Sequence, residues 1–133
     1  MTDILCFGDL LIDFVPTESG LDFADLPVFK PAPGGAAANV ATGLARLGVK
    51  SAFMGKVGDE AFGHLLVDTL KREEVDVRPL RMDKNARTAL AFVTLTKDGE
   101  RDFLFYRHPS ADMLFTPDAV SYTHLTLPTT PYV

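Results

Sequence analysis

The first half of the chain alternates between short continuous apolar runs and apolar residues at helical spacing. Residues 4–7 form a continuous apolar run, which is typical of a strand buried on both faces of a parallel sheet. Apolar side chains then recur at steps of three and four within residues 36–47, which predicts a helix, and Gly48 suits its C-terminal cap. Residues 49–57 predict the next strand, and Asp59 can cap a second helix.

The second helix is expected to be amphipathic. His64 lies near its apolar face, where ordinary packing is a better interpretation than metal ligation, and the helix end has Glu74 where glycine is common. The residues that mark the apolar face are Phe62, Leu65, Leu66, Thr69 and Leu70.

Extended segments complete the pattern. Residues 10–15 continue extended after the first strand until Pro16, and residues 88–96 are rich in β-formers. Asp98-Gly99 is a strong hairpin turn signal, and residues 101–107 form the return strand. The order strand, helix, strand, helix, hairpin predicts an α/β fold: the start of a doubly wound sheet with an antiparallel flap.

Composition and charge exclude several functions. The 133 residues are 47% hydrophobic with a net charge of −5, so one globular domain is expected and nucleic acid or an anionic membrane is a poor partner. Cys6 is the only cysteine and lies in an apolar run, which excludes an internal disulfide and favours a cytoplasmic, inert thiol. The N-terminus has no basic region typical of a signal peptide, and no apolar stretch is long enough to span a bilayer.

The segment PGGAAAN at residues 33–39 is the first candidate for binding chemistry. Gly34 and Gly35 would allow close approach of a ligand or of another backbone, and they open a helix with a positive N-terminal end. Asn39 offers a donor and an acceptor, which suits a sugar hydroxyl. A tight turn with alanines for close helix–sheet packing explains the same residues about equally well.

Asp13 is the second candidate. Open α/β sheets bind ligands at the carboxyl ends of their strands, and Asp13 follows such an end by a few residues. A carboxylate there could accept hydrogen bonds from vicinal hydroxyls. Asp13 is flanked by apolar residues, which a solvated surface group would not explain, whereas Asp9 is better explained as a turn residue.

Other chemistries fit the sequence poorly. A nicotinamide-dependent dehydrogenase of Rossmann type needs G-x-G-x-x-G after the first strand, but Gly8 stands alone there and is followed by a carboxylate. Residues 55–59 look superficially phosphate-binding but lack the spacing of a P-loop. The three histidines are scattered, so no metal site is expected. Arg107 could reach a ligand or form a surface pair with Asp112.

Five segments together resemble the ribokinase-like (PfkB-type) carbohydrate kinases. GGAAANVA at 34–41 and GKVGDEAFG at 55–63 are similar to the N-terminal signature of that family, and GDLLID at 8–13 also matches. Within the family the sequence looks closest to fructokinases, on ARTALAFV at 86–93 and DGERDFLFYRHPSADML at 98–114. The pattern has many fixed points and is therefore specific.

The resemblance implies roles for individual residues. Asp13 would hold sugar hydroxyls, Gly34 and Gly35 would form a hinge and a sugar-facing loop, and Asn39 would bind another hydroxyl. Six substrate-binding residues are thus expected: Asp13, Gly34, Gly35, Asn39 and, from a β lid, Phe105 and Arg107. The lid strands would lie at about 10–33 and 86–107, and lid closure would keep water away from ATP.

The resemblance also implies what the chain lacks. The expected fold is the start of a ribokinase-like doubly wound sheet with an antiparallel β lid, truncated before the C-terminal half. Residues 1–120 would be the N-terminal part of the kinase domain, and residues 121–133, which lack charged side chains, would be a non-family tail, disordered or artefactual. The family's catalytic base and its site for ATP and Mg²⁺ would lie beyond this part, so the chain alone should not catalyse phosphoryl transfer.

The sequence supports one main hypothesis on function and leaves two alternatives open. The parent protein would phosphorylate a sugar, with fructose as the first choice, in the cytoplasm and with no nucleic acid or membrane partner; a homodimer through the lid stays open. One alternative is a catalytically inactive sugar-binding or unstable fragment, which an open sheet edge would favour. The other is the Rossmann-type dehydrogenase.

Overall fold

Three parallel strands form the core sheet of the computed structural model, which describes residues 2–95 and 98–120. The strands are β1 (Ile4–Phe7), β4 (Ser51–Gly58) and β5 (Leu80–Asp83), in the order β1-β4-β5. The central strand β4 is buried along nearly its whole length, as expected for a strand that has a neighbour on each side and a helix against it.

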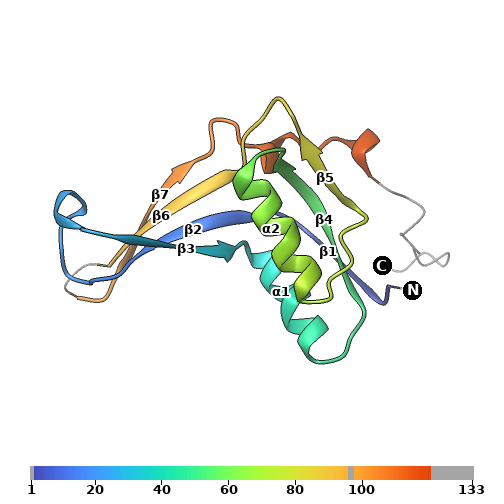
Figure 1. Ribbon diagram of the computed structural model, residues 1–133, viewed down its shortest axis with the longest axis horizontal. Coiled ribbons are helices and arrows are strands. Elements are labelled where there is room, and N and C mark those ends of the chain that lie inside the picture. Colours follow the sequence, from blue (N-terminus) through green and yellow to red (C-terminus); the bar gives the residue numbers. More distant parts are fainter. Residues whose placement is uncertain (1, 96–97, 121–133) are drawn as a thin grey trace, which may run out of the picture.

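Two helices pack side by side against this sheet (Figure 1). Helix α1 (Ala36–Arg46) lies against β1 and β4, and helix α2 (Ala61–Arg72) contacts β4 and β2. An ion pair between Arg46 and Glu73, with Nη2 and Oε1 2.5 Å apart, joins their C-terminal ends. The buried side chains of the core include Cys6, Leu10, Ile12, Ala38, Ala41, Phe53, Val57, Leu66 and Leu70.

A second sheet of four strands projects away from the core (Figure 1), and we call it the lid sheet. Its strands are β2 (Leu11–Pro16), β3 (Phe29–Gly34), β6 (Ala89–Leu95) and β7 (Arg101–Tyr106), in the order β3-β2-β6-β7. The two outer pairs are antiparallel, but β2 and β6 run parallel. Both strands follow a parallel core strand at its carboxyl end, so both leave the core in the same direction.

Three short 3-10 helices complete the described part. One, η1 (Phe23–Asp25), lies in the connection between β2 and β3. The others, η2 (Ala111–Leu114) and η3 (Pro117–Ala119), follow β7, and η2 lies against β4. The expected tail at residues 121–133 lies outside the described residues.

One face of the lid sheet is held together by aromatic side chains, and we call it the aromatic face. Phe92 on β6 stacks on Phe14 of β2, with ring centroids 4.9 Å apart, and meets Phe29 and Tyr106 edge to face. Phe14 also meets Phe62 of α2 edge to face at 5.8 Å. The aromatic face therefore continues into the helical layer of the core.

A polar junction joins the root of the lid sheet to the core. The backbone N–H of Gly58 donates to the Thr88 hydroxyl at 3.0 Å, and this hydroxyl donates to Oε1 of Glu60 at 2.5 Å. Glu60 also accepts from the backbone N–H of Gly63 at 2.8 Å, which caps α2. A Cβ on Gly63 would lie 1.8 Å from the Gly58 carbonyl oxygen, so only glycine fits there.

The cap and exposed face of α2 differ from the sequence prediction. Glu60, rather than Asp59, caps the helix, because Glu60 has the extended backbone of a cap and a side chain long enough to reach the third helical residue. Asp59 instead contacts Nε2 of His64 at 2.8 Å. His64 was expected to pack near the apolar face, but its side chain is 58% exposed, and Leu65 is also exposed.

The ends of both helices adopt left-handed backbone conformations. Gly48 has φ of 87° and closes α1, as predicted. Glu74 has φ of 63° after α2, and it is the one non-glycine residue with positive φ in the part of the chain that the structure describes. The backbone at Glu74 is therefore strained, whereas glycine would adopt the same conformation without strain.

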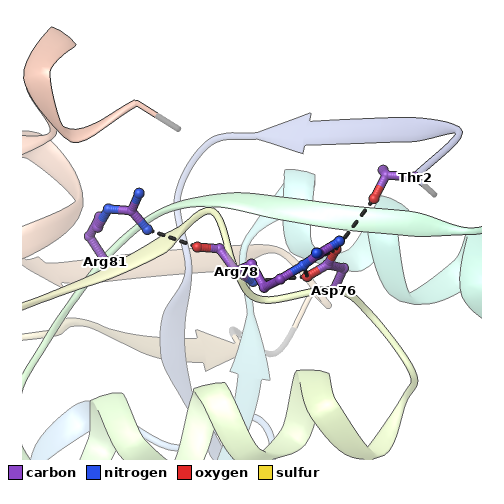
Figure 2. A network of polar contacts seen from close by, with 4 residues as sticks. All are labelled: Thr2, Asp76, Arg78 and Arg81. Atoms are coloured by element: carbon purple, nitrogen blue, oxygen red, sulfur yellow. Dashed lines mark hydrogen bonds and ion pairs between the residues drawn. The ribbon is translucent and has the colours of Figure 1, made fainter. Parts of the chain in front are cut away.

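A polar network fastens the connection between α2 and β5 to the start of the chain (Figure 2). The guanidinium of Arg78 donates to both carboxylate oxygens of Asp76, from Nη2 to Oδ2 at 2.6 Å and from Nε to Oδ1 at 3.0 Å, and Thr2 donates to the same carboxylate at 3.4 Å. Nη1 of Arg81 donates to the Arg78 carbonyl at 2.8 Å. Asp76 also forms a parallel bridge with Ala52 of β4, so this network holds the edge of the core sheet in place.

No helix within residues 2–95 and 98–120 has both the length and the apolar composition that crossing a bilayer requires.

Candidate functional site

The face of the lid sheet opposite the aromatic face carries Asp13, and we call it the Asp13 face. Strand register places Asp13 of β2 beside Ala91 of β6, and Ala91 beside Phe105 of β7. Residues paired in this way point to the same side of a sheet. Asp13 and Phe105 are therefore two strand spacings apart, about 10 Å, with only a methyl side chain between them.

Asp13 lies directly against Gly34 of the neighbouring strand. A Cβ on Gly34 would lie 2.3 Å from Oδ2 of Asp13, so the position of this carboxylate requires glycine at residue 34. Burial raises the pKa of Asp13, the charge of Asp9 raises it further, and Arg101 partly opposes both. The carboxylate is thus partly desolvated and held in one place, which suits an acceptor for ligand hydroxyl groups.

Gly35 serves the backbone packing of α1. It has φ of 109°, and a Cβ would lie 2.4 Å from the carbonyl oxygen of Asp9. A Cβ on Gly8 would similarly lie 2.7 Å from the Cβ of Ala37. The close-packing interpretation of the glycines thus applies to Gly35, whereas Gly34 is tied to Asp13.

Asn39 lies in a different cavity from Asp13. It lines a groove of about 430 Å³ between α1 and α2, together with Gly34, Thr42 and Leu70. Asp13 lines a cavity of about 220 Å³ on its own face of the lid sheet. Gly34 lies at the boundary, because it contacts Asp13 and also lines the groove.

Phe105 lies on the edge strand β7, and Arg107 directly follows this strand. The guanidinium carbon of Arg107 is 5.9 Å from the centroid of the Phe105 ring, and that ring stacks on Phe103 at 5.6 Å. Arg107 pairs with Asp112, whose side chain is only 1% exposed. The pair was expected to be a surface feature; it is largely buried because η2 carries Asp112 against the core.

Arg101 is a site residue that the sequence reasoning missed. It lines the 220 Å³ cavity with Asp13 and Phe103, and its charge lowers the pKa of Asp13. Alternation at every second residue puts Arg101, Phe103 and Phe105 on one face of β7. The alternation of side chains along residues 101–105 could therefore have identified Arg101 from the sequence as a residue of the same face as Phe105.

The described residues fit poorly as a site for magnesium or a nucleotide phosphate. Among residues 2–95 and 98–120, no group of three or more His, Cys, Asp or Glu could hold a metal ion. The glycine-rich segment 55–59 does not leave its amides free, because Gly58 donates to Thr88 and packs against the backbone of Ala86. Cys6 is buried, and burial raises the pKa of its thiol, so it is unreactive.

Comparison with known proteins gives concordant matches. The family model described as "pfkB family carbohydrate kinase" matches residues 1–126. The similar proteins include two from Arabidopsis thaliana. "Probable fructokinase-7" is 64% identical over 113 residues, which cover 85% of this chain and 33% of the relative. "Probable fructokinase-6, chloroplastic" is 64% identical over 111 residues, which cover 84% of this chain and 29% of the relative. The chain therefore spans about a third of the length of these relatives.

A solved structure has the same fold. It is an uncharacterized sugar kinase from Pyrococcus horikoshii in complex with ATP, with a TM-score of 0.84 and 39% identity; the match covers 90% of this chain and 39% of that one. The dehydrogenase alternative gains no support from these matches.

Proposed function

The chain belongs to the pfkB family of carbohydrate kinases, and we propose that the protein to which it contributes transfers a phosphoryl group from ATP to a hydroxyl group of a sugar, with fructose as the sugar. The choice of fructose rests on the names of the relatives, which share about two thirds of their residues with this chain over the matched region.

The observation that carries this proposal is the contact between Asp13 and Gly34. A carboxylate against bare backbone can accept hydrogen bonds from adjacent hydroxyl groups without a side chain in the way. We propose that Asp13 binds two hydroxyls of the sugar and so fixes which hydroxyl faces the phosphate donor. Positioning of this kind supplies much of the rate in phosphoryl transfer.

The other candidate residues complete the sugar site in this proposal. Gly34 and Gly35 shape the turn between the lid sheet and α1, and Asn39 binds a further hydroxyl from the groove side. Phe105 offers an apolar ring to the C–H face of the sugar, and Arg107 offers N–H donors. For Asn39 to meet the sugar held by Asp13, the sugar must lie at the Gly34 boundary.

ATP, Mg²⁺ and the catalytic base belong to the remaining two thirds of the relatives' length in this proposal. Mg²⁺ would neutralise charge on the phosphates when bound. The residues described here would bind and orient the sugar, and the lid sheet would exclude water from it.

A chimaeric enzyme tests the proposal directly. The matched part of this chain replaces the corresponding part of the Arabidopsis protein "Probable fructokinase-7", and we call the product the chimaera. We expect it to form ADP from ATP in the presence of fructose, and to lose this activity on Asp13→Asn with unchanged circular dichroism. An intact chimaera in which Asp13→Asn leaves kcat/KM for fructose unchanged would contradict the role of Asp13.

The alternative of an inactive sugar-binding fragment is supported by a different observation. The outer edge of β1 has no strand beside it in the described part, and Phe7 at the end of this strand is exposed. The 133-residue chain alone should then bind fructose without forming ADP when ATP is present. Calorimetric titration of the chain with fructose, beside a coupled ADP assay, separates this alternative from an autonomous kinase.

Three further expectations remain proposals. We propose that residues 1–120 are the N-terminal part of one kinase domain, with residues 121–133 a separate tail. A homodimer through the exposed side chains of β7 would bury Leu104 and Tyr106, and the molar mass measured by light scattering tests it. Cytoplasmic location is testable by imaging a fluorescent fusion, with a plastid as the contrary outcome.

A further inference from the structure

The ion pair between Arg107 and Asp112 crosses from the lid sheet to a segment fixed on the core. Arg107 follows β7, and its Nη2 donates to Oδ2 of Asp112. Ser110 donates its hydroxyl hydrogen to the other carboxylate oxygen of Asp112. Both oxygens of this carboxylate are therefore engaged, and the side chain is almost completely buried.

The segment that carries Asp112 is held in place by contacts to the core. The backbone N–H of Ala111 donates to the Arg87 carbonyl at 2.7 Å, and Nζ of Lys56 donates to the Leu114 carbonyl at 3.1 Å. The negative charge of Asp112 therefore has a fixed position beside the root of the lid sheet.

Arg107 extends from this anchor toward the Asp13 face. Its guanidinium lies over the ring of Phe105, which is in register with Ala91 and Asp13. Its Nε is buried and has no hydrogen-bond acceptor among the residues that the structure describes. Nη2 of Arg107 is thus committed to Asp112, and the guanidinium is held against the Phe105 ring at the edge of the Asp13 face.

We propose, on the basis of the function proposed above, that Asp112 is a specificity-determining residue that neutralises Arg107 and so makes the site select an uncharged sugar over a sugar acid. A neutralised arginine keeps its hydrogen-bond donors for sugar hydroxyls but attracts a carboxylate weakly. Without Asp112, the same guanidinium would be an unpaired positive charge beside the substrate, which favours an anionic ligand.

Asp112 would affect the choice between an uncharged sugar and a sugar acid, rather than the overall activity. A sugar acid brought to the present site would meet the carboxylate of Asp13, while Asp112 already pairs with the Arg107 guanidinium that could otherwise attract the acid. Arg101 also lies in the Asp13 cavity, but it is the same in every variant compared below. Fructose has no charge to be repelled. Specificity of this kind depends on unfavourable interactions with the wrong substrate as much as on favourable interactions with the right one.

The test compares fructose with 2-keto-3-deoxygluconate, a sugar acid, as substrates of the chimaera. We expect Asp112→Asn to raise the ratio of kcat/KM for the acid to kcat/KM for fructose by roughly ten- to a hundredfold, the range of a charge-assisted hydrogen bond. The amide that this substitution introduces keeps an oxygen that can accept from Ser110. Asp118→Asn, which removes an exposed carboxylate nearby in the chain, should leave the ratio unchanged.

A double variant keeps the test decisive if a charge left unpaired by Asp112→Asn disturbs folding. Asp112→Asn with Arg107→Gln removes both charges, and it should lose the gain for the sugar acid because the unpaired guanidinium is gone. An Asp112→Asn variant that phosphorylates fructose with unchanged discrimination would overturn the inference and leave the kinase function intact. A chimaera that phosphorylates neither sugar would instead contradict the proposed function.

Discussion

The core sheet and the lid sheet differ in how their strands are buried. β4 in the core is buried at nearly every residue, whereas every residue of β7 in the lid is exposed, including Phe103, Leu104, Phe105 and Tyr106. Exposed apolar side chains that gather on one strand are unusual on the surface of a monomer. The core sheet thus buries its apolar side chains, whereas β7 leaves its own in contact with water.

Glycine also serves different purposes in α2 at the junction and in the lid sheet. Gly63 at the junction faces a backbone carbonyl, so its lack of a side chain serves packing alone. Gly34 in the lid sheet faces the carboxylate of Asp13, so its lack of a side chain shapes a candidate binding site. Substituting each of them separates a stability effect from a binding effect.

The largest expected effect is on the junction between the sheets. Gly63→Ala in the chimaera should lower the free energy of unfolding by about 3 kcal/mol, because its Cβ would lie 1.8 Å from the Gly58 carbonyl oxygen. The control is Gly43→Ala in α1, where a Cβ meets nothing within 4 Å; it should raise stability by up to about 1 kcal/mol. Urea unfolding of both variants measures this contrast, and equal stabilities would show that the junction is not tightly packed.

The next effect falls on the Asp13 face. Gly34→Ala should displace the Asp13 carboxylate and lower kcat/KM for fructose by roughly a hundredfold, since misplacing a positioning group by about 1 Å has effects of that order. Asp3→Asn, at an exposed residue just before β1, serves as the control and should keep normal kinetics. A Gly34→Ala variant with the kcat/KM of the unsubstituted chimaera would contradict the proposed role of this glycine in the sugar site.

A smaller effect is expected on the stability of the lid sheet. Because burial and then Asp9 raise the pKa of Asp13, the ionised carboxylate is less favourable in the folded protein than in the unfolded chain. Stability should therefore fall as pH rises from the unfolded pKa to the raised folded pKa, and stay reduced at neutral pH. Asp13→Asn should remove this penalty and raise the urea midpoint at neutral pH while abolishing fructose binding.

The matched control for Asp13→Asn is Asp3→Asn, at an exposed residue just before β1. We expect no change in its urea midpoint. A lower midpoint for Asp13→Asn at neutral pH would mean that the carboxylate stabilises the fold, contrary to a role in binding only.

The smallest effect is expected just after the C-terminal end of α2. Glu74→Gly should raise the free energy of unfolding by about 0.5–1 kcal/mol, because Glu74 has φ of 63°, a conformation that glycine adopts without strain. Glu73→Gly, one residue earlier, should instead destabilise, since Glu73 pairs with Arg46. Thermal unfolding of the two variants checks the sign of each shift, and the same sign for both would refute the strain argument.

Local pattern in the sequence was enough to predict both helices, the core strands β1 and β4 and the left-handed end at Gly48, but not the third core strand, β5. Their signals are the spacing of apolar side chains and the conformational freedom of one glycine. The parallel pairing of β2 with β6 was not predictable in this way, because it joins segments far apart in the chain and depends on where both leave the core.

The candidate site was predictable only in part. Asp13 drew attention as a carboxylate between apolar neighbours, and its contact with Gly34 gives that placement a physical reason. The burial of Asp112 depends on how η2 packs against β4, which no local pattern encodes. The capping of α2 by Glu60 rather than Asp59 similarly depends on the contact with Thr88 of the lid root.

The most direct test of the central claim is a crystal structure of the chimaera with fructose bound. The account predicts that the sugar lies on the Asp13 face, with a hydroxyl oxygen within about 3 Å of the Asp13 carboxylate. Fructose in the groove between α1 and α2 without contact to Asp13, or against Phe92 on the aromatic face, would contradict it.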